Sequence, residues 1–357
     1  MSAAARTYLI TRVHGLRTHL ITLRDLKLLV RAKTSREVSD NLLRTEYGPE
    51  ISKLPTKEVD AATLEGIFLK TLVERFYFVP REAQGTMQEL LNRYCARFEV
   101  ENIKRIIRQK HGGETVEEPN LIPLPREYTL VNFPALLNAK DVEEVVSLLR
   151  ETPYRSLADK LQPYRETGST MVLEAALDEI YFGKVWKVVS KMSRGGGLRD
   201  LIGEEIDLRN LLIIFSLKAR GLPSNLMEKT LIPLTYKVAG TVLHSLLQAR
   251  LEDAPSILTT PRYSKPLSEA VNIIRGGSTS LLERPFLSQL YDDASRALKT
   301  RFLDTGYVIA YLLLCECEAK NLVSIVIGKQ LGMTEEQINT VLVENPKRVL
   351  TFVPAKE

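Results

Sequence analysis

The sequence Glu99-Val-Glu-Asn-Ile-Lys-Arg-Ile-Ile-Arg-Gln-Lys110 occurs in three versions in this chain. The other two are Asp207-Leu-Arg-Asn-Leu-Leu-Ile-Ile-Phe-Ser-Leu-Lys218 and Glu318-Ala-Lys-Asn-Leu-Val-Ser-Ile-Val-Ile-Gly-Lys329. Each version has an acid three residues before its Asn, an Ile four residues after it, a Lys eight after it and a Gly eleven after it. The asparagines are Asn102, Asn210 and Asn321, which recur at a period of about 110 residues. A register kept across three copies indicates that one structural unit has been triplicated.

Further landmarks keep the same period. The pairs Leu64-Glu65, Leu173-Glu174 and Leu282-Glu283 are evenly spaced along the chain. A Thr-x-Tyr pattern precedes the first two pairs, as Thr45-Glu-Tyr47 and Thr152-Pro-Tyr154, and Thr260-Pro-Arg-Tyr263 precedes the third with one extra residue. We therefore predict three multi-helix units, covering residues 1–115, 116–230 and 231–357, the last with a short C-terminal helix.

Composition sets the broad class of protein. The chain has 357 residues, 44% of them hydrophobic and 26% charged, which is ordinary for a folded protein and excludes a disordered or collagen-like chain. The net charge of +5 is compatible with an anionic partner but does not require nucleic acid, and we expect no nucleic-acid partner. The cysteines Cys95, Cys315 and Cys317 are odd in number and lack disulfide or metal-ligand spacing, so we expect them in the core of a protein from a reducing compartment.

Hydrophobic periodicity predicts helices throughout. Apolar residues recur every three to four positions over residues 6–33, which predicts a single first helix there. Residues 57–78 and 81–111 are expected to form further helical segments, separated at Pro80. The glycine-rich run Arg194–Gly197 is expected to be a loop. No sustained strand alternation appears, so the predicted class is all-α.

The repeated polar residues allow two interpretations. On a helix, the acid, Asn, Ile and Lys of each motif fall within one quadrant. The asparagines could form three equivalent binding sites, or they could lock the helices of one unit together, and faithful copying favours this internal lock. Glu65, Glu174 and Glu283 lie on the preceding helical segments, where each could accept a hydrogen bond from such an Asn or pair with a Lys.

Catalytic and ligand-binding motifs are missing from the sequence. It has no Gly-x-x-x-x-Gly-Lys-Ser/Thr phosphate loop and no Gly-x-Ser-x-Gly elbow. The four histidines and three cysteines show no metal-binding spacing. We therefore expect no catalytic residue, no metal, no cofactor and no small-molecule substrate.

The motifs resemble those of a known family. They include Tyr8-x-x-x-Arg-Val-x-Gly-Leu16, Thr45-x-Tyr47, the three Asn motifs and Gly306-Tyr-Val-Ile-Ala-Tyr311. Together they are similar to the C subunit of archaeal-type (A-type/V-type) rotary ATP synthases, which is related to the d subunit of vacuolar ATPases. The resemblance covers nearly the whole chain.

This resemblance implies an all-α, funnel-like protein with three similar units in a pseudo-threefold arrangement around a central cavity. It implies a non-catalytic central-stalk subunit, peripheral on the cytoplasmic side of the cell membrane, that links the central-axle subunits to the proteolipid rotor ring and transmits torque. Arg6, Arg12 and Arg17 precede the first acid and would suit an anionic membrane surface or the ring. Whether the repeated asparagines line the cavity or are buried between helices is left open.

Two other functions remain as alternatives. An α-helical repeat scaffold for cytosolic proteins or RNA would need an open superhelix, but a period of about 110 residues suits small domains better than solenoid repeats. An enzyme using the repeated glutamates would need a carboxylate with a perturbed pKa in an open pocket.

Overall fold

The computed structural model describes residues 2–54, 59–114, 121–192, 196–222, 224, 228, 230–301 and 303–343. Within these ranges the chain forms helices and loops and contains no β-strand, so the all-α prediction is confirmed. None of the helices described there is both long and apolar enough to cross a membrane.

Helices of very different lengths follow one another along the chain. The first third contains α1 (Ala3–Arg17), α2 (Leu23–Arg31), α3 (Ser35–Leu42), α4 (Gly48–Ile51), α5 (Ala61–Glu82), α6 (Gly85–Cys95) and α7 (Arg97–Gly112). The middle third contains η2 (Arg126–Tyr128), α8 (Phe133–Asn138), α9 (Val142–Leu148), η3 (Arg155–Lys160), α10 (Leu161–Thr167), α11 (Met171–Val189) and α12 (Gly196–Ala219). The last third contains α14 (Gly240–Gln248), η4 (Leu251–Asp253), α15 (Ala254–Ile257), α16 (Pro261–Arg275), η5 (Thr279–Leu281), α17 (Arg284–Thr300), α18 (Gly306–Gln330) and α19 (Glu335–Val341).

Three kinds of element recur in this order. The motif helices α7, α12 and α18 carry the repeated Asn. The middle helices α5, α11 and α17 begin close to the repeated Leu-Glu pair. The heads are the segments of short helices that precede each middle helix, at residues 21–54, 130–167 and 236–275.

The prediction of one helix over residues 6–33 was wrong. Helix α1 ends at Arg17, and α2 starts afresh at Leu23. Thr22 caps α2 in a reciprocal capping box with Asp25, which satisfies backbone N–H groups that a continuous helix would have bonded internally. The N–H of Ile21, between the two helices, donates to the Glu318 carboxylate instead. The spacing of apolar residues cannot reveal such a break, because the same spacing continues from one helix into the next.

The expected break at Pro80 was also wrong. Helix α5 continues through Pro80 to Glu82, and the next break lies at Ala83 and Gln84. Proline has no N–H to donate to the carbonyl of Phe76, four residues earlier. That carbonyl instead accepts a hydrogen bond from the Cys95 thiol, with an S···O distance of 3.3 Å. The structure thus tolerates the proline by supplying a substitute donor from α6.

The loop predicted for residues 194–197 is wrong at its second half. Gly196 and Gly197 already belong to α12, while Arg194 and Gly195 lie outside the described residues. A Cβ on Gly306 at the start of α18 would come within 2.7 Å of the Gly197 backbone. These glycines therefore permit the close approach of α12 and α18.

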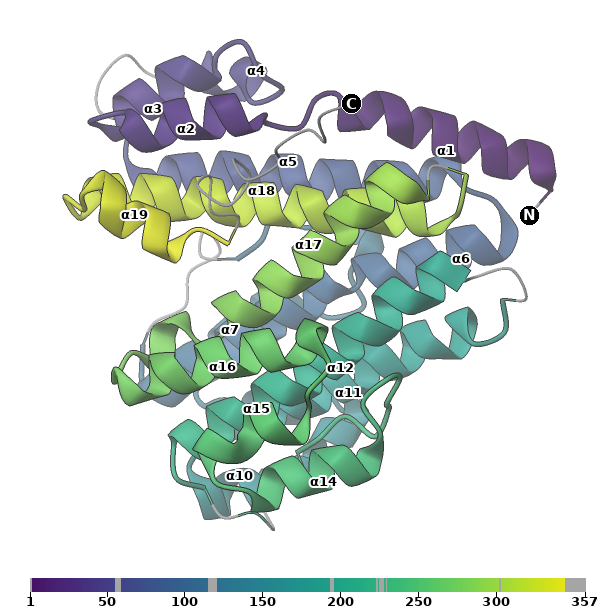
Figure 1. Ribbon diagram of the computed structural model, residues 1–357, viewed down its shortest axis with the longest axis vertical. Helices are drawn as coiled ribbons and strands as arrows, with labels where there is room; N and C mark the ends of the chain where they lie inside the picture. Colours follow the sequence, from purple (N-terminus) through teal and green to yellow (C-terminus); the bar gives the residue numbers. More distant parts are fainter. Residues whose placement is uncertain are drawn as a thin grey trace, which may run out of the picture.

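The two ends of the chain share a core. In Figure 1 the purple N-terminal head (α2–α4) lies beside the yellow end of α18 and α19, and α5 runs alongside α18. A buried cluster joins Val38, Leu42 and Phe68 to Leu322 and Ile338. A second, larger buried cluster extends through the rest of the molecule. All three cysteines are buried, as the sequence predicted.

Candidate functional site: a charged cavity among three repeated helices

The acid of each motif binds a tyrosine from a head. In all three cases the tyrosine hydroxyl donates to the carboxylate, at 2.6, 3.0 and 2.6 Å in the pairs Tyr154–Glu99, Tyr263–Asp207 and Tyr47–Glu318. The same carboxylates also accept backbone N–H groups just before the first helix of that head. These donors are Leu130 for Glu99, Tyr236, Lys237 and Val238 for Asp207, and Ile21 for Glu318. Each acid therefore fixes both the start and the Tyr of a head.

Each motif Asn binds the chain that returns along its helix. The Asn102 side chain donates to the Ile122 carbonyl at 2.9 Å and accepts the Ile122 N–H at 2.8 Å. Asn210 does the same with Ile232, at 3.1 and 2.9 Å, and also donates to the Leu234 carbonyl at 3.0 Å.

The third Asn makes fewer such bonds. Asn321 accepts the Val343 N–H at 2.9 Å, but its own amide N–H contacts only the Cys317 sulfur, at 3.6 Å, among the residues that the structure describes. The asparagines are 1%, 0% and 2% exposed, and none of them lines the cavity that lies among the motif and middle helices. The sequence left open whether the asparagines line the cavity or are buried, and the structure shows that they are buried between helices and loops.

Each motif Lys binds carbonyl groups at or near the end of the first helix of a head. Lys110 donates to Leu137 at 2.8 Å, Lys218 to Leu247 and Ala249 at 2.9 and 2.6 Å, and Lys329 to Val30 at 2.6 Å. A cation suits this position because the last carbonyls of a helix lack internal donors and carry partial negative charge.

These contacts connect neighbouring units in a closed series. Helix α7 holds the second head, α12 holds the third head, and α18 holds the first head. The sequence suggested that the motif fastens one unit internally, and this interpretation is corrected, because every acid–Tyr pair joins two of the predicted units. The unit boundaries 1–115, 116–230 and 231–357 themselves stay a prediction.

The closing contact between the chain's two ends gives a first testable expectation. Replacing Tyr47 with Phe removes the hydrogen bond to Glu318 while keeping the ring, and should lower the free energy of unfolding by about 1.5–3 kcal/mol. Urea denaturation measures this loss, and limited proteolysis should show earlier cleavage in residues 21–54. Tyr154→Phe is the matched control, since it should cost a similar free energy without exposing the N-terminal head.

A cavity of about 900 Å³ lies among the motif and middle helices. Glu65, Glu174 and Glu283 all line it, although they come from three different predicted units. Among the described lining residues are seven acidic and eight basic side chains, so the cavity is densely charged but close to neutral.

Five residues before each Asn, the motif helices contribute three charged side chains that meet. Arg97 donates to Glu205 and, at 2.6 Å, to Glu316. The Arg97 side chain is only 11% exposed. Burial opposes its charge, but the neighbouring Glu205 and Glu316 outweigh it and hold the pKa of Arg97 well above its ordinary value. One cation thus ties two carboxylates from the other two motif helices.

One residue before each Asn lies a second set of charges, namely Glu101, Arg209 and Lys320. Glu101 pairs with Arg108 at 3.1 Å. Arg209 approaches Asp178 and Glu283 only to 3.9 Å. The signs in this set are the reverse of those in the first, with one acid and two bases.

The three repeated glutamates have different partners. Glu174 binds Arg108 at 2.7 Å and accepts from the Thr170 hydroxyl at 2.9 Å. The positive charge of the nearby Lys320 lowers the pKa of Glu283 from its ordinary value. Glu65 has no hydrogen-bond or ion-pair partner among the residues that the structure describes. None of the three accepts a hydrogen bond from a motif Asn within that part of the chain.

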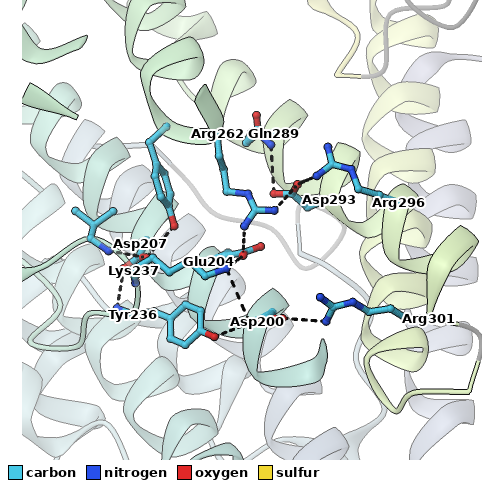
Figure 2. A network of polar contacts seen from close by, with 12 residues as sticks. Asp200, Glu204, Asp207, Tyr236, Lys237, Arg262, Gln289, Asp293, Arg296 and Arg301 are labelled. Carbon is cyan, nitrogen blue, oxygen red and sulfur yellow. Dashed lines mark hydrogen bonds and ion pairs between the residues drawn. The ribbon is translucent and has the colours of Figure 1, made fainter. Parts of the chain in front are cut away.

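Polar contacts at the third head form a wider network (Figure 2). There Arg262 of the head lies between Glu204 of α12 and Asp293 of α17, with 3.2 Å to Asp293. The positions equivalent to Arg262 and Asp293 in the first unit are Glu46 and Arg75, which pair at 2.7 Å with the charges exchanged. The same contact between a head and a middle helix is therefore made with opposite polarity in two units.

The arginines expected near a membrane or ring lie on α1. Arg12 is exposed and pairs with Glu82 at 3.1 Å, while Arg6 and Arg17 are partly exposed. Across the described ranges, no group of three or more His, Cys, Asp or Glu side chains is arranged to hold a metal ion.

Two features of the site were not predicted, although the sequence contains a signal for each of them. The partners of Asn102 and Asn210 lie in the tetrapeptides Leu121-Ile-Pro-Leu124 and Leu231-Ile-Pro-Leu234, which keep the spacing of the repeat. The meeting of Arg97, Glu205 and Glu316 could have been found from their shared offset from the Asn together with their opposite charges.

Comparison with known proteins identifies the family of this chain. A model of the family "ATP synthase (C/AC39) subunit" matches residues 9–341. The chain belongs to this family. The match covers nearly the whole chain and confirms the resemblance predicted from the three Asn motifs.

Curated relatives of this C/AC39 chain come from several archaea. The C subunit of the A-type ATP synthase of Methanocaldococcus jannaschii is 26% identical over 349 residues, which cover 95% of this chain and 86% of the relative. The protein of the same name from Methanothermobacter thermautotrophicus is 29% identical over 327 residues, covering 88% and 84%. That from Haloferax volcanii is 26% identical over 345 residues, covering 94% and 97%.

Proposed function

We propose that this chain is the non-catalytic central-stalk subunit of an A-type rotary ATP synthase. It links the central axle to the proteolipid ring on the cytoplasmic side of the membrane and transmits torque for ion-coupled ATP synthesis or hydrolysis. Membership of the C/AC39 family and relatives named as C subunits of A-type ATP synthases support this role. The prediction that the chain is not itself an enzyme agrees with the same family.

The observation that carries the proposal is the cavity of about 900 Å³ between helices that are fastened to one another three times over. A torque-transmitting part must resist twisting, and buried hydrogen bonds between every pair of neighbouring units favour that property. We propose that the cavity receives the foot of the axle and that the units surround it in a funnel-like, pseudo-threefold arrangement.

The alternative of an RNA-binding scaffold receives less support. A groove for nucleic acid carries an excess of Lys and Arg. The seven acidic side chains in this cavity nearly balance its eight basic ones. A partner with charges of both signs suits this lining better than a polyanion.

A bridging assay tests the proposed function. The proteolipid ring is immobilised through a tag in detergent, and the axle subunits of the same complex are added with and without this chain. We expect the axle to be retained only when the chain is present. Equal retention without the chain, or binding of the chain to neither partner, would refute the proposed link.

Helix α1 gives a prediction about the membrane side. Arg6→Glu combined with Arg17→Glu should weaken binding to the ring about tenfold or more at low salt, because each Lys or Arg near an anionic surface contributes about 1 kcal/mol. Raising the salt concentration should shrink the difference. Arg24→Glu on α2 is the control, and co-sedimentation with ring-containing vesicles is the measurement. Unchanged binding at low salt would remove α1 from the interface.

A further inference from the structure

The cavity presents three faces that share their backbone contacts but differ in charge. Each motif helix is held by the same acid and Lys bonds, so the positions one residue before the Asn are structurally equivalent. These positions carry Glu101, Arg209 and Lys320, and all three line the cavity. Charge at this level therefore distinguishes the face of Glu101 from the other two. Arg209 differs from Lys320 in lying 3.9 Å from the carboxylates of Asp178 and Glu283.

Two of the lining charges lack a direct partner inside the protein. Lys320 makes no hydrogen bond or ion pair with any residue in the described part of the chain, and the same holds for Glu65. The nearby Glu283 raises the pKa of Lys320, so its ammonium group stays charged. An acid on α5 and a base on α18 thus both face the cavity without a direct ion pair among the described residues.

The sequence gives a cause for the lack of a direct partner for Glu65 among the described residues. Its equivalent, Glu174, is bound by Arg108, which lies six residues after Asn102. Six residues after Asn321 the chain has Ile327, which cannot form an ion pair and is 40% exposed. The contact that Arg108 makes is therefore incomplete on the side where the chain's two ends meet.

Unpaired charges in a recess favour a partner of matching charge. Water solvates them while the cavity is open, and a protein segment that displaces this water must supply opposite charges or lose affinity. A segment with an acid toward Lys320 and a base toward Glu65 would satisfy both groups at once. The same segment turned to the face of Glu101 would place its acid near that carboxylate. Turned to the face of Arg209, it would meet a cation that Asp178 and Glu283 already approach to 3.9 Å.

We propose that these unequal charges fix the rotational orientation of the axle segment in the cavity, with an acidic side chain of the axle facing Lys320 and a basic one facing Glu65. This inference rests on the proposed function and specifies the partner's chemistry. Three identical faces would accept the axle in three orientations of equal energy. A torque coupler needs one orientation, and the charge differences select it.

A charge-exchange variant tests the orientation directly. Glu65→Lys combined with Lys320→Glu keeps the net charge of the chain and of the cavity unchanged, so general electrostatic attraction predicts unchanged binding. We expect the affinity for the purified axle subunits, measured by calorimetry or biolayer interferometry, to fall about tenfold or more. Lys265→Glu, an exposed position on α16 away from the cavity, should leave the affinity unchanged.

A milder variant covers the case in which the carboxylate introduced at position 320 repels Glu283 and disturbs folding. Lys320→Met removes the charge without introducing repulsion, and thermal melting of each variant checks its stability. Since Lys320 has no direct ion pair to lose among the described residues, we expect a melting temperature close to that of the unmodified chain. The affinity for the axle should fall about threefold to tenfold.

Cross-linking reads out the orientation itself. Ser216 on α12 and Ser324 on α18 both line the cavity, and Ser216→Cys or Ser324→Cys can carry a photo-reactive maleimide, because the native cysteines are buried. Each reporter should capture its own axle peptide, and the captured peptides should change in the charge-exchange variant. Unchanged affinity and unchanged peptides would overturn the inference alone. Failure of the unmodified chain to bind the axle would overturn the proposed function as well.

Discussion

Replacing Arg97 with Met is expected to lower the free energy of unfolding by about 3–5 kcal/mol, because it leaves the buried Glu205 and the partly buried Glu316 without their cation. Arg97 is the only cation among the described residues that binds both Glu205 and Glu316. Its removal leaves these carboxylates of α12 and α18 facing each other in a site where burial already raises the pKa of Glu205. Equilibrium unfolding in urea, followed by circular dichroism, measures the loss.

A triple variant distinguishes the effect of the stranded charges from the effect of side-chain packing. Arg97→Met, Glu205→Met and Glu316→Met together replace the group with apolar side chains of similar size. Because well-packed apolar replacements of buried ion groups are often neutral or stabilising, the triple variant should recover most of the lost stability. If the triple variant were as unstable as the single one, the loss would come from the shape of Arg97 and not from the stranded carboxylates.

Replacing Asn210 with Leu should lower the free energy of unfolding by about 3 kcal/mol or more. The substitution leaves the N–H and carbonyl of Ile232 and the carbonyl of Leu234 without their side-chain partner, and each unsatisfied buried group costs about 1–3 kcal/mol. A large loss of stability in urea is expected from the internal contacts. Normal stability with failed assembly would instead identify Asn210 as an interface residue.

The three asparagines provide a graded comparison. Asn102→Leu should resemble Asn210→Leu, because Asn102 also binds both polar groups of one residue. Asn321→Leu should cost less, since Asn321 makes a single backbone hydrogen bond within the described residues, to Val343, besides its weak sulfur contact. Equal losses at all three positions would show that the cost comes from the shape of the substituted side chain.

The repeated units were easier to predict than the contacts between them. The spacing of Asn102, Asn210 and Asn321 identified equivalent helices, because a triplicated unit keeps its landmarks in register. Helical periodicity placed the acid, Asn and Lys on one face, but it says nothing about what that face meets. The partners of the acid and the Lys proved to be a head from another unit, and for α18 that head lies near the opposite end of the chain.

The positions at which helices end or continue depend on contacts with residues that are distant in sequence. The separation of α1 from α2 is supported by the bond from Ile21 to Glu318, almost three hundred residues away. The continuity of α5 through Pro80 is supported by a thiol donor on α6. Neither can be derived from the periodicity of the segment itself, because in both cases the decisive partner lies on another helix.

The charged lining was only partly foreseeable. Glu65, Glu174 and Glu283 were singled out as a repeated set, and all three line the cavity. Their difference could not be seen from the repeat alone, because it depends on which cation approaches each glutamate. Alignment of Arg108 with Ile327 explains why Glu65 has no ion-pair partner in the part of the chain that the structure describes. That alignment becomes informative once α5 and α18 are known to pack together.

Photo-cross-linking from the cavity tests the proposed role most directly. A photo-reactive group attached at Ser216→Cys is activated in the assembled rotary complex, and a group at Lys265→Cys on the exposed side of α16 serves as the control. If the cavity holds the axle, the Ser216 position should yield adducts with the axle subunits and the Lys265 position should not. Adducts from Ser216 with other subunits only, or none in an active complex, would contradict the proposal that this chain couples the axle to the ring through its cavity.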